Sequence, residues 1–124
     1  MIIALLLAIV NPALDAFDNA NDALTSCGFA FHREAAAADK GLSQFKSELG
    51  SRCADEIAQM RRAIIALETG RGKTRAAAQS SAEETIAFFY ASHGDGYARR
   101  HETDAKLRAL IDLVEKEGAK SDAE

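Results

Sequence analysis

The sequence has few aromatic residues and almost no proline. It contains no tryptophan, aromatic residues make up 6% of its 124 positions, and Pro12 is its single proline. Strands favour aromatic and β-branched side chains, whereas the alanine that is abundant here favours helix. The composition therefore predicts an all-α protein, and its length fits a single domain.

An excess of positive charge is also missing. The formal net charge is −4, and hydrophobic residues make up 48% of the chain. A mildly acidic chain gives no reason to expect a nucleic-acid partner. The balance of apolar and charged residues is that of a globular protein rather than a disordered or membrane protein. We therefore expect no nucleic-acid partner and no transmembrane span in the mature chain.

Motifs that carry catalysis are absent as well. No C-x-x-C or His-Glu-x-x-His pattern occurs, and no spacing joins serine, histidine and acid into a nucleophilic triad. Gly72-Lys73-Thr74 resembles the end of a phosphate-binding loop, but Leu67 stands where that loop requires its first glycine. The sequence thus predicts a protein without enzymatic activity and without a cofactor.

The N-terminal residues indicate export. Residues 2–10 form an unbroken apolar run, followed by Asn11-Pro12 and small residues up to Ala16. Such a run suits the core of a signal peptide and is about half as long as a membrane span. We predict a signal peptide over 1–16, cleaved after Ala16, and a periplasmic or secreted bacterial protein. No lysine or arginine precedes the run, so two alternatives stay open: a true start upstream of Met1, or a buried first helix in an uncleaved cytosolic protein.

A second processing signal competes with this interpretation. Leu24-Thr25-Ser26-Cys27 resembles a bacterial lipobox, in which the cysteine is acylated. A lipobox should follow the apolar run directly, but Asp15, Asp18 and Asp22 intervene. We therefore expect no lipid anchor at Cys27.

Apolar residues recur every three or four positions along the rest of the chain, the spacing of amphipathic helices. The expected helices cover residues 17–39, 42–67, 75–93 and 97–118, with 119–124 as a disordered tail. Glycines mark the turns between them, at Gly41, Gly70 and the Gly94-Asp95-Gly96 stretch. Four such helices joined by short turns predict an up-down four-helix bundle over 17–118.

The two cysteines form the strongest pattern. Cys27 and Cys53 each lie 13 residues from Lys40, the centre of the first predicted turn, so a helical hairpin brings them side by side. In an exported protein this predicts a disulfide linking the first two helices. A disulfide needs its Cα atoms closer together than the axes of packed helices, and Gly28 and Gly50 would permit that approach. In a cytosolic protein the same residues would be two free thiols.

Charged residues gather at one end of the predicted bundle. The basic ones are Arg61, Arg62, Arg71, Lys73 and Arg75. In an up-down bundle both acidic termini lie at that end, with Asp15, Asp18 and Asp22 on one side and Glu115, Glu117, Asp122 and Glu124 on the other. Internal charge complementarity then explains the cluster, and binding of anionic lipid or lipopolysaccharide is the alternative.

Histidines and aromatic residues gather at the opposite end. They are His32, His93, His101, Phe31, Phe45, Phe88, Phe89, Tyr90 and Tyr97. His101 and Asp104 are three residues apart on one predicted helix, and with His93 across a turn they can offer three ligands to a metal ion. The ordinary alternative is one packed histidine and two solvated ones.

The consecutive residues Phe88, Phe89 and Tyr90 point in three directions from a helix. Either the third helix is central in the bundle, or a ring is exposed and contacts a partner or a second copy. The candidate contact residues are Phe88, Tyr90 and Tyr97.

These patterns favour a non-enzymatic exported protein that acts as a structural or interaction module of the bacterial periplasm or envelope. Its partner would be a protein or another envelope component, and a homodimer is possible on this pattern. The alternative is a helical bundle that binds a small ligand or a metal at the end rich in histidine and aromatic residues.

Overall fold

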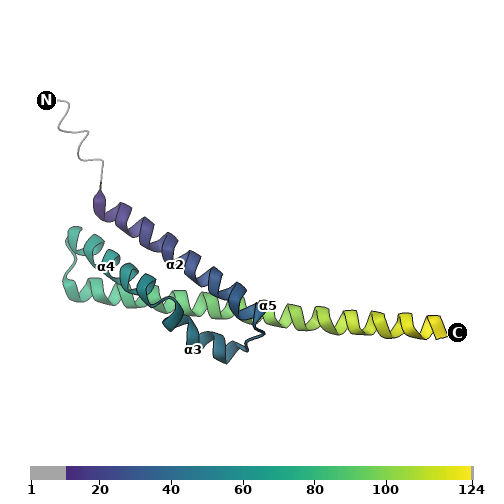
Figure 1. Ribbon diagram of the computed structural model, residues 1–124. Helices are drawn as coiled ribbons and strands as arrows, with labels where there is room; N and C mark the ends of the chain where they lie inside the picture. The colour runs from purple at the N-terminus through teal and green to yellow at the C-terminus, as the bar shows by residue number, and fades with distance from the viewer. Residues whose placement is uncertain (1–10, 124) are drawn as a thin grey trace.

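The computed structural model describes residues 11–123, which form four helices and contain no strand (Figure 1). The helices are α2 (Pro12–Ala37), α3 (Leu42–Arg52), α4 (Ala54–Gly70) and α5 (Arg75–Ala123). The predicted all-α class is confirmed. The apolar run 2–10 lies outside the described residues, and the predicted cleavage site after Ala16 falls within α2, so the signal peptide stays a prediction.

Local sequence explains where α2 begins and ends. The side-chain oxygen of Asn11 accepts hydrogen bonds from the N–H groups of Ala13 and Leu14 at 3.1 and 3.4 Å, and Pro12 occupies the first helical position. At the other end Asp39 adopts a left-handed conformation, with φ of 52°. The chain therefore turns at Asp39, and Gly41, the predicted stop, instead precedes α3.

The folded body consists of three helical segments that run back and forth. The chain runs out along α2, returns along α3 and α4, and runs out again along α5 (Figure 1). Helix α4 packs against both α2 and the first half of α5, so it lies at the centre of the body. The core is built from side chains of all four helices, among them Leu24, Phe31, Phe45, Leu49, Met60, Ile64, Ile86, Phe89 and Tyr97.

The predicted up-down four-helix bundle is wrong, because its third and fourth helices are one helix, α5. Gly94 and Gly96 do not break α5; they let other helices approach it. A Cβ built on Gly96 would lie 3.5 Å from Cε1 of His32, and one on Gly94 would lie 3.0 Å from Cε of Lys46. The glycines that suggested a turn therefore mark close contacts with α2 and α3.

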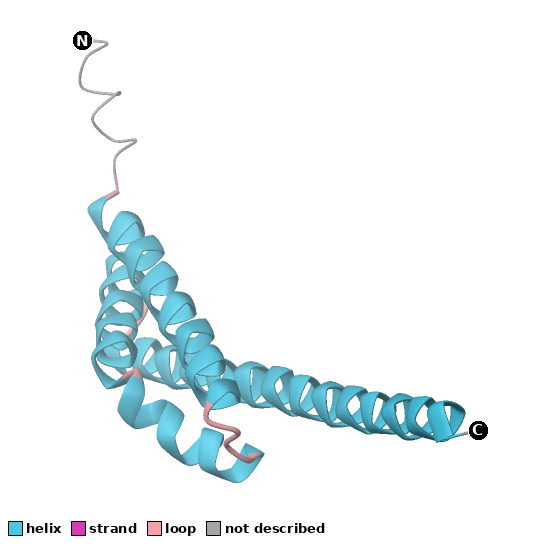
Figure 2. Cartoon of the chain, turned by 45° about the vertical axis from the view of Figure 1, so that its right-hand side comes forward, coloured by secondary structure: helices cyan, strands magenta, loops and turns pink. Residues whose placement is uncertain are grey.

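Because α5 does not turn back, its second half leaves the body. We call residues 102–123 the distal arm. It projects alone beyond the other helices (Figures 1 and 2). From residue 102 to 121 every side chain except that of Asp104 is exposed. Residues 119–123, predicted as a disordered tail, belong to this helix. At its base Arg108 contacts Asp39 at 3.4 Å.

The predicted second helix is divided into α3 and α4 at Cys53. Its φ of −110° and ψ of 24° depart from helical values. The N–H of Cys53 still donates to the carbonyl of Leu49, and the N–H of Ile57 donates to the carbonyl of Cys53. The break thus changes the direction of the chain without a loop.

Candidate functional site

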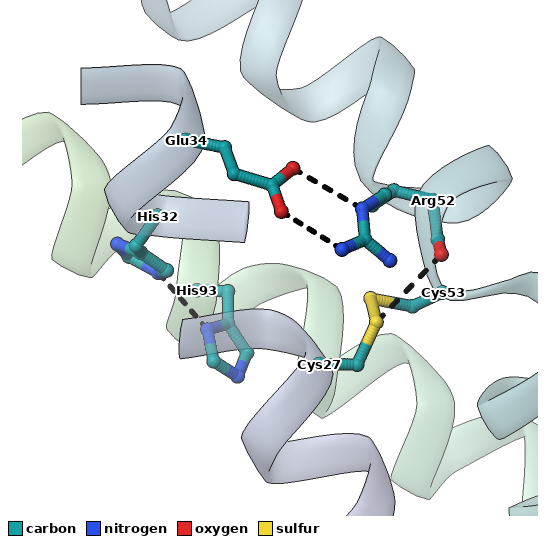
Figure 3. The surroundings of a disulfide bond; sticks show 6 residues. All are labelled: Cys27, His32, Glu34, Arg52, Cys53 and His93. Atoms are coloured by element: carbon teal, nitrogen blue, oxygen red, sulfur yellow. Dashed lines mark hydrogen bonds and ion pairs between the residues drawn. A yellow bond between two sulfur atoms is a disulfide. The ribbon is translucent and has the colours of Figure 1, made fainter. Parts of the chain in front are cut away.

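The two cysteines form a disulfide, as predicted, with their Cα atoms 5.9 Å apart. The expectation that it links the first two helices needs correction, since Cys53 lies at the junction of α3 and α4 (Figure 3). The helix break at Cys53 lets the chain come close to α2. Gly28 and Gly50 do not serve this purpose: Gly28 faces the ring of His93, and Gly50 faces the hydroxyl of Tyr90.

An ion pair lies beside the disulfide (Figure 3). The guanidinium of Arg52 donates to both carboxylate oxygens of Glu34, at 2.8 Å from Nη2 and 3.2 Å from Nε. These hydrogen bonds lower the pKa of Glu34 and raise that of Arg52. Both side chains are about half exposed, so water screens the pair and it contributes little to stability.

The most distinctive polar feature of the body is a pair of buried histidines. Nε2 of His32 on α2 lies 2.9 Å from Nδ1 of His93 on α5, which is hydrogen-bond distance (Figure 3). Each residue is less than a tenth exposed. His93 packs over Gly28 of α2, and His32 packs over Gly96 of α5. Each imidazole therefore occupies the space that a glycine leaves on the opposite helix.

Aromatic rings surround the histidine pair. Phe45 lies against His32 with ring centroids 4.9 Å apart, and stacks on Tyr97 at 4.2 Å. Phe89 lies 4.6 Å from His93. The predicted meeting of histidines and aromatic residues at one end is confirmed for these five residues.

The surroundings favour the uncharged form of both rings. Burial lowers the pKa of both histidines, and repulsion by a protonated His93 and by Arg100 lowers that of His32 further. One neutral ring must donate the shared hydrogen bond and the other must accept it. The pair is therefore a neutral connection between α2 and α5 rather than a cationic site.

The structure does not assemble the predicted metal ligands. His93 faces His32, whereas His101 lies two turns further along α5, exposed and beside Tyr97. Asp104 lies with His101 in a separate hollow at the C-terminal end of α2. Within residues 11–123 no group of three or more histidine, cysteine or acidic side chains is placed to hold a metal.

A groove between α2 and α5 opens beside the histidine pair. It has a volume of about 360 Å³. Thr25 and Phe29 of α2 and Ser92, His93 and Arg99 of α5 line it. The ring of Phe29 is half exposed. The Ser92 hydroxyl donates to the carbonyl of Phe88. An aromatic wall, the Thr25 hydroxyl and a guanidinium without an ion pair among the described residues suit a small amphipathic anion.

The three candidate contact aromatics have different surroundings. Phe88 is 72% exposed and offers a free ring next to this groove. The ring of Tyr90 lies over Gly50 and is only partly exposed. Tyr97 is 1% exposed, and its hydroxyl donates to the backbone carbonyl of Lys40. Tyr97 therefore cannot contact a partner, because the helical turn at Lys40 covers it.

Five of the nine exposed large hydrophobic residues within 11–123 lie elsewhere, on the distal arm. Four of its residues, Leu107, Leu110, Ile111 and Val114, are between 48% and 63% exposed. Leu110 and Ile111 follow Leu107 by three and four positions, and Val114 follows Ile111 by three, so the four residues lie on one face of the helix. We call them the arm stripe. The sequence predicted an amphipathic helix here, with its apolar face in the core of a bundle. An amphipathic pattern identifies the apolar face of a helix but not the element that packs on it.

The basic cluster has local partners. Arg61 pairs with Glu83 at 2.7 Å, and Lys73 with Glu68 at 3.2 Å. The expected neutralisation by Glu115 and Glu117 is wrong, since α5 carries them to the opposite end of the molecule from the α4–α5 turn (Figure 1).

Comparisons of the chain with protein-family models, curated proteins and solved structures gave no match. None of the helices within residues 11–123 has an apolar stretch long enough to cross a membrane.

Proposed function

We propose that this chain is an exported, non-enzymatic interaction module of the bacterial periplasm or envelope, and that its distal arm is the element that docks. One observation carries the proposal: the arm stripe is a continuous apolar face on a helix that projects from the body with nothing of residues 11–123 packed against it.

The energetics of helices support this role. Most helical stability in proteins comes from packing an apolar face against other elements. The arm has such a face but no tertiary contact beyond Arg108. Contiguous exposed apolar surface is also uncommon on proteins that bind nothing. A partner on the stripe would supply the missing packing and stabilise the helix.

Two features support export. The apolar run 2–10 has the length of a signal-peptide core. Disulfides persist in oxidising compartments such as the periplasm, and Cys27 and Cys53 have the geometry of one. The mass of the protein recovered from a bacterial periplasm would test this part: a chain that begins at Phe17 and is two hydrogens lighter than its reduced form is expected.

The docking role is tested by photo-crosslinking in a bacterial host. Benzoylphenylalanine replaces Leu110 in the stripe, and in a matched control it replaces Lys116 on the opposite face of the arm. We expect discrete crosslinked species from position 110 and none from position 116. Equal crosslinking at both positions, or none at position 110, would overturn the proposal.

The groove beside His93 favours a second candidate function, the binding of a small amphipathic anion. Anilinonaphthalene sulfonate is a suitable probe, because its rings match Phe29 and its sulfonate matches Arg99. Binding to the native chain that is lost in Arg99→Ala and Phe29→Ala, but kept in Leu110→Ser, would support this function. Binding lost only in Leu110→Ser would assign the probe to the arm and exclude the groove.

A further inference from the structure

We propose that the partner of the distal arm is a second copy of the same chain, docked antiparallel along the arm stripe. The inference rests on the proposed docking role of the arm and names its occupant. Two further properties of α5 lead to it: the distribution of charge along the helix, and the symmetry of the stripe.

Charge changes sign along the exposed half of α5. Residues 99–108 carry four basic side chains, Arg99, Arg100, Lys106 and Arg108, and two acidic ones, Glu102 and Asp104. Residues 109–121 carry three acidic side chains, Asp112, Glu115 and Glu117, and two basic ones, Lys116 and Lys120. The first segment is therefore net positive and the second net negative.

This distribution selects one orientation of two arms. Parallel arms would place the positive segments together and the negative segments together. Antiparallel arms centred near Ile111 place each positive segment beside the partner's negative segment, with Lys106 close to Glu117 of the second copy. Opposite charges across a pairing are favourable and like charges are unfavourable, so the antiparallel arrangement is preferred.

The spacing of the residues in the arm stripe is compatible with the antiparallel orientation. Its residues follow each other at intervals of three, one and three, so the pattern reads the same in both directions. Reversal brings Leu107 opposite Val114 and keeps Leu110 and Ile111 at the centre of the pair. Each arm spans roughly 33 Å at the rise of an α-helix. The two bodies then lie at opposite ends of the pair, because each arm projects beyond its own body (Figure 2).

Only four apolar residues per chain lie in the stripe, so we expect a weak dimer, with a dissociation constant on the order of tens of micromolar. Sedimentation equilibrium of the purified, oxidised chain measures it. Leu110→Ser should weaken association at least tenfold. Circular dichroism of the same samples should show more helix as the concentration rises, because pairing stabilises the arms.

A charge exchange tests the orientation. Lys106→Glu and Glu117→Lys should each weaken self-association roughly three- to tenfold, since each puts like charges together in an antiparallel pair. An equimolar mixture of the two variants should associate at least as tightly as the native chain. In a parallel pair Glu117→Lys alone would not weaken association, because a like-charged pair would only change its sign. Lys106→Glu also breaks the ion pair of Lys106 with Glu102 within the arm, so Glu117→Lys and the mixture decide the orientation. Lys116→Glu, on the opposite face, is the matched control and should change association less than twofold.

The outcomes separate this inference from the proposed function. A native chain that stays monomeric at about 1 mM overturns self-pairing. If the crosslinked species from position 110 in the host is then a different protein, the docking role of the arm stands. Dimers that Lys106→Glu and Glu117→Lys leave intact would overturn the antiparallel arrangement. A monomer together with no crosslink at position 110 overturns both proposals.

Discussion

The imidazole of His93 lies in the space that a side chain at Gly28 would fill. A Cβ built on Gly28 would be 2.4 Å from Cε1 of His93, closer than two non-bonded carbon atoms can approach. The contact brings α5 close enough to α2 for His93 to reach His32. Its companion is Gly96, which leaves room for His32. This reciprocal arrangement fixes how α2 and α5 cross.

Gly28→Ala should therefore destabilise the protein. The added methyl group must push the ring of His93 away from His32, and overpacking of this kind costs about 1–3 kcal/mol. Urea unfolding of the oxidised chain measures the loss. Gly70→Ala is the control, because a Cβ on Gly70 meets nothing within 4 Å. Equal unfolding free energies for the two variants would show that the contact at Gly28 does not matter.

The histidine pair should make stability depend on pH. Burial lowers the folded-state pKa of His32 and His93 below the usual 6.5. Below that pH the unfolded chain takes up protons that the folded pair does not bind, so the free energy of the unfolded state falls relative to that of the folded state. Stability is thus complete above about pH 6.5 and falls as the pH is lowered. We expect a lower urea midpoint at about pH 5 than at about pH 7.5.

The control for this prediction removes both titrating groups. The double variant His32→Gln/His93→Gln should have a lower unfolding free energy than the native chain at neutral pH, but a flatter dependence between about pH 5 and pH 7.5. The same slope in both proteins would assign the pH dependence to other groups.

Loss of the disulfide should be costly. The bridge closes a loop between positions 26 residues apart, and on the chain-entropy model it stabilises the fold by about 3 kcal/mol. Denaturation with and without reductant measures this difference. The double variant Cys27→Ala/Cys53→Ala should resemble the reduced chain and should not respond to reductant. A native chain that unfolds at the same urea concentration in both conditions would contradict the prediction.

Tyr97→Phe tests the anchor at the base of α5. The Tyr97 hydroxyl donates to the carbonyl of Lys40 and ties α5 to the turn after α2. Without it the buried carbonyl loses its donor, at a cost of about 1 kcal/mol in unfolding free energy. Tyr90→Phe is the matched control, since the Tyr90 hydroxyl has no hydrogen-bond partner among residues 11–123. An equal loss in both variants would remove any special role from the Tyr97 hydroxyl.

Sequence patterns predicted what depends on neighbours along the chain. The helical period of the apolar residues predicted a helix over 17–39, which covers most of α2. Its start at Asn11 and Pro12 was missed, because these two residues were assigned to the signal peptide. The pairing of Cys27 and Cys53 followed from their equal distance from Lys40, because a hairpin relates positions by counting residues. His32 and His93 were correctly grouped with Phe45, Phe89 and Tyr97, but the group lies midway along α5 rather than at an end of the molecule.

Predictions failed where a residue has two possible roles. Glycine in a helical pattern can end the helix or let another helix approach, and Gly94 and Gly96 do the second. The contact of His32 with His93 was missed for the same reason. Its only sequence signal is the glycine close to each histidine, Gly28 before His32 and Gly96 after His93. That signal acquires meaning only when α2 and α5 are known to cross there.

The sequence by itself therefore determined an all-helical chain and the pairing of Cys27 with Cys53 across its first turn, since hydrophobic period and residue spacing are local properties. The tertiary structure decided that α5 is continuous and that the apolar face of the arm stays uncovered. It also decided that Gly28 makes room for the ring of His93 rather than for the backbone of α3. An amphipathic pattern fixes which side of a helix is apolar. Which surface covers that side depends on the path of the whole chain, and here the path of α5 leaves Leu107, Leu110, Ile111 and Val114 exposed to solvent.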